Sequence, residues 1–165
     1  MALFHRHRLP AERRPPLARD ERLLAWADSD AGLLVATNLG LWLPMSPPAR
    51  LGWHEIHKAA WNGSDLVVTA ASELAERDGY TVVEDVAPVT FRLPEPGQLP
   101  HQVRARVTRS VGYSMHHARP GVRVAARRVP GVDGLRWTVR YDLGVEILDP
   151  AVVAATDRLV AAARE

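Results

Sequence analysis

The residues best suited to chemistry in this chain are two histidines and a glutamate that stand together as His54, Glu55 and His57. Two imidazoles four residues apart on a helix, with a glutamate after the first, form the zinc-binding pattern HExxH. Here the histidines are only three residues apart, and on a strand they would point to opposite faces. We therefore predict no metal site. The three residues remain candidates for a small enzyme whose site is assembled from scattered polar groups.

Other catalytic patterns are missing from the sequence. The chain has no cysteine, which excludes disulfides, thiolate nucleophiles and cysteine-based zinc sites. It has no glycine-rich phosphate-binding loop. Ser110 and Ser114 lack the context of a nucleophile elbow. Glu84 and Asp85 are adjacent and would diverge on a strand, so they do not form an acid–base pair. We expect no catalytic residue and no cofactor, and hence a protein that is not an enzyme.

The charged side chains are distributed unevenly along the chain. Of the 21 basic residues, Lys58 is the only lysine, and the arginines can all make bidentate contacts with anions. Residues 1–19 carry five arginines and one acid, and residues 20–96 carry five basic and twelve acidic residues. Residues 97–140 carry nine arginines and one acid, and residues 141–165 carry two arginines and five acids. An acidic middle therefore precedes a strongly basic segment.

The basic segment has a predictable geometry. Residues 122–128 and 135–141 alternate apolar with polar side chains and predict a β-hairpin with one buried apolar face. The opposite face gathers guanidinium groups, a candidate surface for an acidic protein, an anionic lipid surface or a nucleic-acid backbone. With one arginine from the segment before it, this surface comprises Arg123, Arg127, Arg136, Arg140 and Arg104. The alternative is internal pairing with acids of the chain, including Glu73, Glu76, Asp78, Glu84 and Asp85.

The five tryptophans lie in runs typical of strands and are expected in the core or half-buried in a sheet. Strict alternation between residues 53 and 61 would place aromatic and polar side chains together on one face of a strand. This second candidate partner surface comprises Trp53, Glu55, His57 and Trp61.

The remaining patterns place these residues on elements. Residues 1–19 are rich in arginine and proline and predict a flexible basic arm. Strands are expected at residues 22–27, 33–37, 41–43, 53–61, 66–69, 80–83, 89–93, 122–129 and 135–141. Asn62-Gly63 predicts a hairpin turn with positive φ at both residues. Three valines four residues apart predict a helix over 99–111, and Asp149-Pro150 begins a C-terminal helix.

Two stretches of the β-rich part are similar to the short bacterial pleckstrin-homology-like domains. They are Leu34-Val35-Ala36-Thr37-Asn38-Leu39-Gly40-Leu41-Trp42-Leu43 and Trp53-His54-Glu55-Ile56. The resemblance covers residues 20–112 and implies a strongly bent seven-strand sheet capped at one end by the helix at 99–111. Members of that family bind proteins or lipids. The resemblance carries over no ligand-contacting motif.

The sequence thus predicts an α+β, β-rich fold in three parts. Residues 1–19 form the arm, residues 20–112 a pleckstrin-homology-like bent antiparallel sheet or barrel with its capping helix, and residues 113–165 a C-terminal hairpin and helix packed on the same core. No apolar run reaches the roughly 18 residues that span a bilayer, so we expect a soluble, cytoplasmic protein.

The predicted function is that of a non-enzymatic binding or adaptor domain acting through protein or anionic-surface contacts. Two alternatives stay open. One is the small enzyme built on His54, Glu55 and His57. The other is a nucleic-acid-associated protein that uses the arginine-rich hairpin, although the sequence lacks the stacking aromatics of known single-strand-binding modules.

Overall fold

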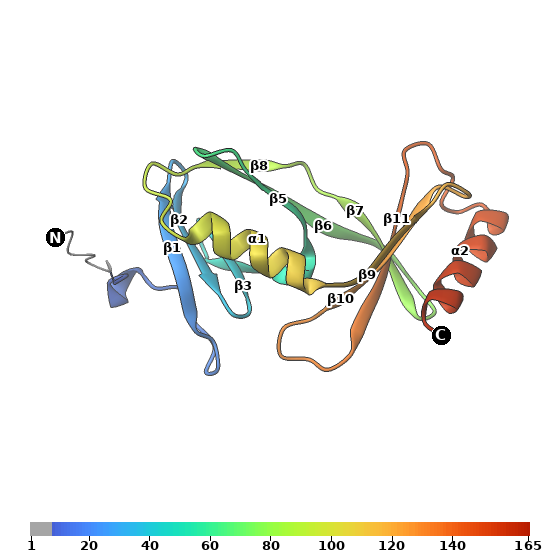
Figure 1. Ribbon diagram of the computed structural model, residues 1–165, viewed down its shortest axis with the longest axis horizontal. Coiled ribbons are helices and arrows are strands. Elements are labelled where there is room, and N and C mark those ends of the chain that lie inside the picture. The colour runs from blue at the N-terminus through green and yellow to red at the C-terminus, as the bar shows by residue number, and fades with distance from the viewer. Residues whose placement is uncertain (1–7) are drawn as a thin grey trace.

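The computed structural model describes residues 8–165, which form a strand-rich α+β structure with two helices (Figure 1). The first strands are β1 (Leu23–Ser29), β2 (Gly32–Thr37), β3 (Gly40–Leu43), β4 (Ala49–Gly52), β5 (Ile56–Trp61) and β6 (Asp65–Arg77). The later strands are β7 (Tyr80–Asp85), β8 (Val89–Arg92), β9 (Val111–His117), β10 (Val122–Arg128) and β11 (Leu135–Tyr141). The helices are α1 (Leu99–Ser110) and α2 (Pro150–Ala163), with short 3-10 turns η1 (Ala11–Arg13) and η2 (Trp53–Glu55).

The strands form two sheets. The smaller one is antiparallel, in the order β1-β2-β3-β4. The larger one has the order β5-β6-β7-β11-β10-β9, with β8 also paired to β6, and β7 runs parallel to β11. Strand β6 is 13 residues long, so its first half pairs with β5 and β8 while its second half pairs with β7. In Figure 1 this strand runs from the half that contains α1 toward the half that contains α2.

Each helix covers its own apolar cluster. Leu99, Val103 and Val107 of α1 are buried in a cluster with side chains from β1, β2, β3, β5, β6 and β8. Val160 of α2 is buried in a second cluster with side chains of β7, β10 and β11. The C-terminal hairpin therefore shares a sheet with the preceding strands, but its apolar side chains pack in a cluster separate from that of α1. This differs from the single shared core expected from the sequence.

Several predicted elements are confirmed. The hairpin of β10 and β11 pairs Val122 with Tyr141 and Arg128 with Leu135. Helix α1 ends one residue earlier than expected, and α2 begins as predicted because Asp149 accepts a hydrogen bond from the Ala151 amide at 2.8 Å. Strands β4 and β9 and the second half of β6 were not predicted.

The β5–β6 hairpin is also confirmed, but its turn differs from the expected type. Only Gly63 has positive φ, at 99°, and Asn62 does not. Instead, the Asn62 side-chain oxygen accepts hydrogen bonds from the amides of Ser64 and Asp65 at 2.9 and 2.7 Å. An asparagine that caps the turn with its side chain has no need of a left-handed backbone.

The described part of the expected arm is packed rather than free. Leu9 is only 3% exposed and lies with Val35 and Trp42 in a third apolar cluster. Arg13 pairs with Asp28 of β1. The prediction of a flexible arm is therefore wrong for residues 8–19, because its few apolar side chains suffice to anchor it on the small sheet. Residues 1–7, which include Arg6, lie outside the described part of the chain.

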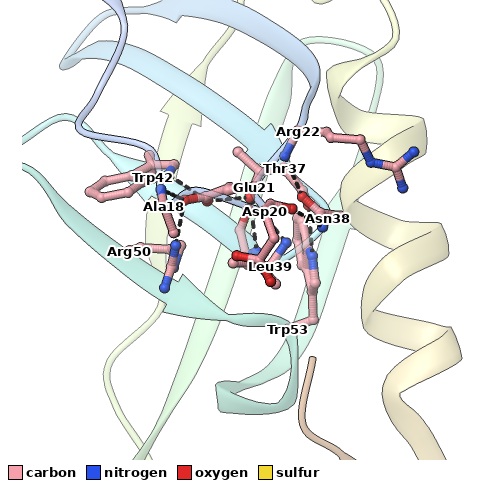
Figure 2. Close-up of polar contacts among 11 residues, drawn as sticks. Ala18, Asp20, Glu21, Arg22, Thr37, Asn38, Leu39, Trp42, Arg50 and Trp53 are labelled. Atoms are coloured by element: carbon pink, nitrogen blue, oxygen red, sulfur yellow. Dashed lines mark hydrogen bonds and ion pairs between the residues drawn. The ribbon is translucent and has the colours of Figure 1, made fainter. Parts of the chain in front are cut away.

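A buried carboxylate ties this N-terminal segment to the small sheet (Figure 2). The Glu21 side chain is fully buried and accepts hydrogen bonds from the Ala18 amide at 2.9 Å, the Thr37 hydroxyl at 2.6 Å and the Trp42 indole at 3.0 Å. Arg50 of β4 adds an ion pair at 2.5 Å. Burial alone would raise the pKa of Glu21, but these donors outweigh it and lower that pKa below its ordinary value.

Candidate functional site

One face of the larger sheet is polar, and it is the face opposite α2. The β10–β11 register sets Arg123 across from Arg140 and Arg127 across from Arg136, so the four guanidinium groups share a face, as predicted. Acidic residues of β6 and β7 lie on the same side, and η2 borders it. We call this surface the polar sheet face; it comprises Arg123, Arg127, Arg136, Arg140, Glu73, Asp85, His54, Glu55 and His57.

Two of the four hairpin arginines are held by the protein's own acids. Arg136 pairs with Glu73, and Arg140 donates to Asp85 at 2.7 Å. A third, Arg123, donates to the Ser114 hydroxyl at 2.9 Å. The interpretation of this hairpin as an open anion-binding surface therefore needs correction, since neighbouring strands supply acceptors for most of its charge. Pairing of these arginines with acids of the chain was the alternative prediction from the sequence. The sequence could not predict that β6, β7 and β11 lie side by side.

Arg127 differs from the other three because it is buried. It is 9% exposed, and its guanidinium donates to the Ile56 carbonyl at 2.8 Å and the Ser110 hydroxyl at 3.1 Å. Among residues 8–165 it makes no ion pair with a carboxylate. Burial, together with repulsion from Arg140, lowers the pKa of Arg127 below its ordinary value.

His57 joins this network from β5. Its Nδ1 lies 2.5 Å from Asp85 Oδ1. Burial lowers the pKa of His57, and the hydrogen bond to Asp85 only partly opposes this. The pKa of Asp85 is also lowered: burial works against ionisation, but donors from His57 and Arg140 outweigh it. A neutral imidazole bonded to an ionised aspartate is thus the favoured state near neutral pH.

His54 lies close by, on η2. Its Nδ1 is buried and has no hydrogen-bond partner among the described residues, and burial lowers its pKa. A cavity of about 40 Å³ lies between these groups. Its lining includes His54, Glu55, His57, Glu73, Arg127, Arg136 and Thr138.

This arrangement brings together the three residues considered for catalysis. A histidine oriented by an aspartate is one half of a nucleophilic site, and the other half is a hydroxyl or thiol at hydrogen-bond distance. Within residues 8–165, His57 has only Asp85 and Arg140 as side-chain partners. In the same region, no group of three histidine, aspartate or glutamate side chains is placed to hold a metal ion.

The aromatic partner face expected over residues 53–61 does not form. Trp53 belongs to η2 rather than to a strand, is 2% exposed, and donates from its indole to the Thr37 carbonyl at 2.9 Å. A bulge between Ile56 and Lys58 breaks the alternation again. Glu55 and His57 therefore line the polar cavity, whereas Trp61 lies at the far end of β5. The prediction of one shared face is wrong because alternation holds only within an unbroken strand.

Trp61 instead lines a groove beside α1. The groove has a volume of about 470 Å³, within the range of binding pockets. It is lined by Trp61, Pro96, Gly97, Gln98, Pro100, His101, Arg104, Ala105 and Thr108. Trp61 is half-buried and Arg104 is exposed, so the groove offers an aromatic wall with a cation at its rim.

Arginines without a partner gather on α1 and beside it. Helix α1 carries three arginines and no acid, and Figure 2 shows the Arg22 side chain extending from the start of β1 toward this helix. We call these four residues the α1 cationic face: Arg22, Arg104, Arg106 and Arg109. They wrap around the exposed side of the helix, since residues two positions apart on a helix point in nearly opposite directions. Arg104 lies on the flank with Trp61, and Arg106 lies on the flank with Arg22. Burial and repulsion from Arg109 and Arg22 lower the pKa of Arg106. Of these residues, only Arg104 was predicted from the sequence to contact a partner, although the sequence has no acidic residue between positions 99 and 110.

The α1 cationic face contrasts with the hairpin. In the part of the chain that the structure describes, its four side chains make neither an ion pair nor a hydrogen bond, and the buried Nε of Arg106 has no acceptor.

Comparison with family models, with curated proteins and with solved structures finds no match to this chain. None of the helices within residues 8–165 is long and apolar enough to cross a membrane.

Proposed function

We propose that this protein is a non-enzymatic binding module that docks an acidic protein segment on the α1 cationic face. One observation carries the proposal: the hairpin arginines find acceptors within the protein, whereas Arg104, Arg106 and Arg109 on α1 have none among the described residues. Like charges placed three residues apart on a helix repel each other, as Arg106 and Arg109 do. A bound carboxylate would relieve this repulsion.

The groove supports a protein segment as the partner. A lipid surface or a nucleic-acid backbone needs mainly an array of cations. The α1 cationic face adds a ligand-sized recess with an indole wall beside Arg104, and an apolar anchor in a pocket, surrounded by polar contacts, is typical of protein interfaces. The proposed partner is therefore an acidic segment that carries an apolar side chain among its carboxylates.

The architecture is compatible with this role. We propose that residues 20–112, with β1 to β8 and α1, correspond to the bent sheet and capping helix of a pleckstrin-homology-like domain. The antiparallel order of β1 to β4 and the position of α1 after the strands support the proposal. Strands β9 to β11 and α2 extend the sheet beyond that pattern.

The test uses the full chain and a fluorescein-labelled glutamate-rich peptide with one leucine. We expect anisotropy to report binding that weakens steeply between about 50 and 200 mM salt, as ion-pair contacts do. The variant Arg106→Gln/Arg109→Gln should weaken binding about tenfold or more, which corresponds to about 1.4 kcal/mol. The matched control Arg136→Gln/Arg140→Gln removes the same charge from the hairpin and should bind almost as the unmodified protein does.

Two further arms separate the alternatives. Replacing the leucine of the peptide with serine should weaken binding if the groove takes an apolar side chain. Two anionic competitors are tested separately: vesicles that contain phosphatidylserine, and single-stranded DNA. Equal weakening by both double variants, or tighter binding to vesicles or DNA than to the peptide, would overturn the proposal.

The His57–Asp85 pair keeps an enzymatic role as the second candidate. Its neutral imidazole and ionised carboxylate are the protonation states that a general base needs. A hydrolytic activity abolished by both His57→Gln and Asp85→Asn in folded protein would support it. No loss in either variant would exclude this pair as the site.

A further inference from the structure

We infer that the polar cavity at Arg127 is a binding site for a small monovalent anion, of the size of chloride or of a carboxylate group. The cavity lies on the polar sheet face and shares no lining residue with the α1 cationic face. The inference therefore stands independently of the function proposed above.

The first argument is the burial of an uncompensated charge. Arg127 is 9% exposed, and in the described part of the chain only the neutral oxygens of Ile56 and Ser110 accept from it. Taking a charged group out of water carries a large desolvation penalty unless an opposite charge compensates it. The Ser110 hydroxyl also donates to the Val107 carbonyl at 2.7 Å, so it can offer Arg127 a lone pair but no charge.

The second argument is the sign of the local potential. Two carboxylates line the cavity, but they face water: the side chains of Glu55 and Glu73 are 43% and 55% exposed. Glu73 is already paired with Arg136. Water screens such charges, whereas the charge of Arg127 is largely unscreened. The dominant unscreened charge at the cavity is therefore positive.

The two histidines lie within reach of the same arginines. Burial is the main cause of the lowered pKa of His54; Glu55 opposes it, and Arg136 and Arg127 add to it. For the pKa of His57, burial again comes first, the hydrogen bond to Asp85 opposes it, and Arg140 and Arg127 add to it. Both rings line the cavity, and the buried Nδ1 of His54 has no partner within residues 8–165.

The third argument is size. A cavity of about 40 Å³ is large enough for a monatomic anion or the two oxygens of a carboxylate, and much smaller than pockets for nucleotides or sugars. Arg127 and Thr138 both line the cavity, and a guanidinium and a hydroxyl are donors from which such an anion accepts hydrogen bonds. The ligand class follows from this combination of a small volume, a buried cation and neutral donors.

The experiment titrates the full chain with sodium chloride or sodium formate. Gluconate, an anion too large for the cavity, keeps the ionic strength constant. Ring signals of His54 and His57 and the Nε signal of Arg127 are followed by nuclear magnetic resonance. We expect a saturable shift of these signals with chloride and formate, and none with sulfate. The pKa of His54 should rise when the anion is bound, since a nearby negative charge favours the protonated ring.

Two variants test the site, and a third variant serves as the control. Arg127→Gln removes the charge, and Ala71→Leu fills the cavity from β6 without changing any charge. Each should weaken anion binding about tenfold or more. Arg123→Gln, a loss of the same charge on the same strand face, should leave binding unchanged. Should Arg127→Gln fail to fold, Ala71→Leu decides alone.

Three results would overturn the inference. They are the absence of a saturable response in the unmodified protein, an undiminished response in folded Ala71→Leu, and a response to sulfate equal to that to chloride. The first would mean that the cavity holds water only.

Discussion

The Glu21 carboxylate gives the sharpest test of how the fold is held together. We consider Glu21→Gln, which keeps the shape of the side chain and replaces one of its two acceptor oxygens with a donor. In the native protein one oxygen accepts from Thr37 and Trp42, and the other accepts from the Ala18 amide and Arg50. Glutamine can serve only one of these two pairs of donors.

The least costly arrangement sets the size of the effect. If the amide oxygen keeps the contacts to Ala18 and Arg50, the Thr37 hydroxyl can turn toward the Gly40 carbonyl at 3.3 Å, but the Trp42 indole loses its acceptor. A buried donor left unpaired costs about 1–3 kcal/mol, and a charge-assisted bond to Arg50 that becomes neutral loses about 1 kcal/mol. We expect a loss of about 3 kcal/mol in the free energy of unfolding.

Urea denaturation followed by tryptophan fluorescence measures this loss, which should also lower the Tm by roughly 6–12 °C in a chain of this size. Glu55→Gln is the control, because that side chain is 43% exposed and keeps its bond from the Gly52 amide; we expect a change below about 1 kcal/mol. Equal effects of the two substitutions, or less than about 1 kcal/mol for Glu21→Gln, would refute the reasoning.

The difference between the native protein and Glu21→Gln should also depend on pH. The pKa of Glu21 is lower in the folded protein than its ordinary value of 4.5. The carboxylate therefore stabilises the fold fully above that ordinary value, and the stabilisation is lost as the pH falls through the folded pKa. A difference in stability that stays constant down to strongly acidic pH would mean that the charge of Glu21 contributes nothing.

Three further predictions follow from single contacts. Gly40→Ala should destabilise the protein strongly, because a Cβ there would lie 2.2 Å from a backbone oxygen of β4. Gly112→Ala should have a mild effect, because the atom nearest to its Cβ, at 3.0 Å, is the end of a flexible side chain. Thermal unfolding compares the stability of the two variants. Asp149→Ala should cost about 1 kcal/mol through the lost N-cap of α2, measured by urea denaturation. The lowered pKa values of His54 and His57 mean that stability should decline as the pH falls below their ordinary value of 6.5, and His54→Gln/His57→Gln should flatten that decline if the reasoning holds.

The local parts of this fold could be predicted from the sequence. The β10–β11 hairpin, α1 and α2 each depend on a short pattern: alternation around a Pro-Gly turn, valines four residues apart, and an aspartate before a proline. These patterns determine structure within one element, where neighbours in the chain are neighbours in space.

The long-range parts could not be predicted. The pairing of β11 with β7, which brings Asp85 to Arg140 and Glu73 to Arg136, joins segments more than 50 residues apart and leaves no local signal. The failure at Trp53 has a different cause, since a single 3-10 turn ends the alternation on which the prediction depended. The candidate site was therefore predicted as separate sets of residues, and only the fold placed Glu55, His57 and Arg127 around one cavity.

The most direct test of the central claim is a map of the backbone amides that respond when the full chain binds the glutamate-rich peptide. We predict chemical-shift changes concentrated in α1, around Arg104, Arg106 and Arg109, and at the start of β1, with little change in β10 and β11. Changes concentrated in the β10–β11 hairpin, with α1 unaffected, would contradict the claim that the acidic partner docks on the α1 cationic face.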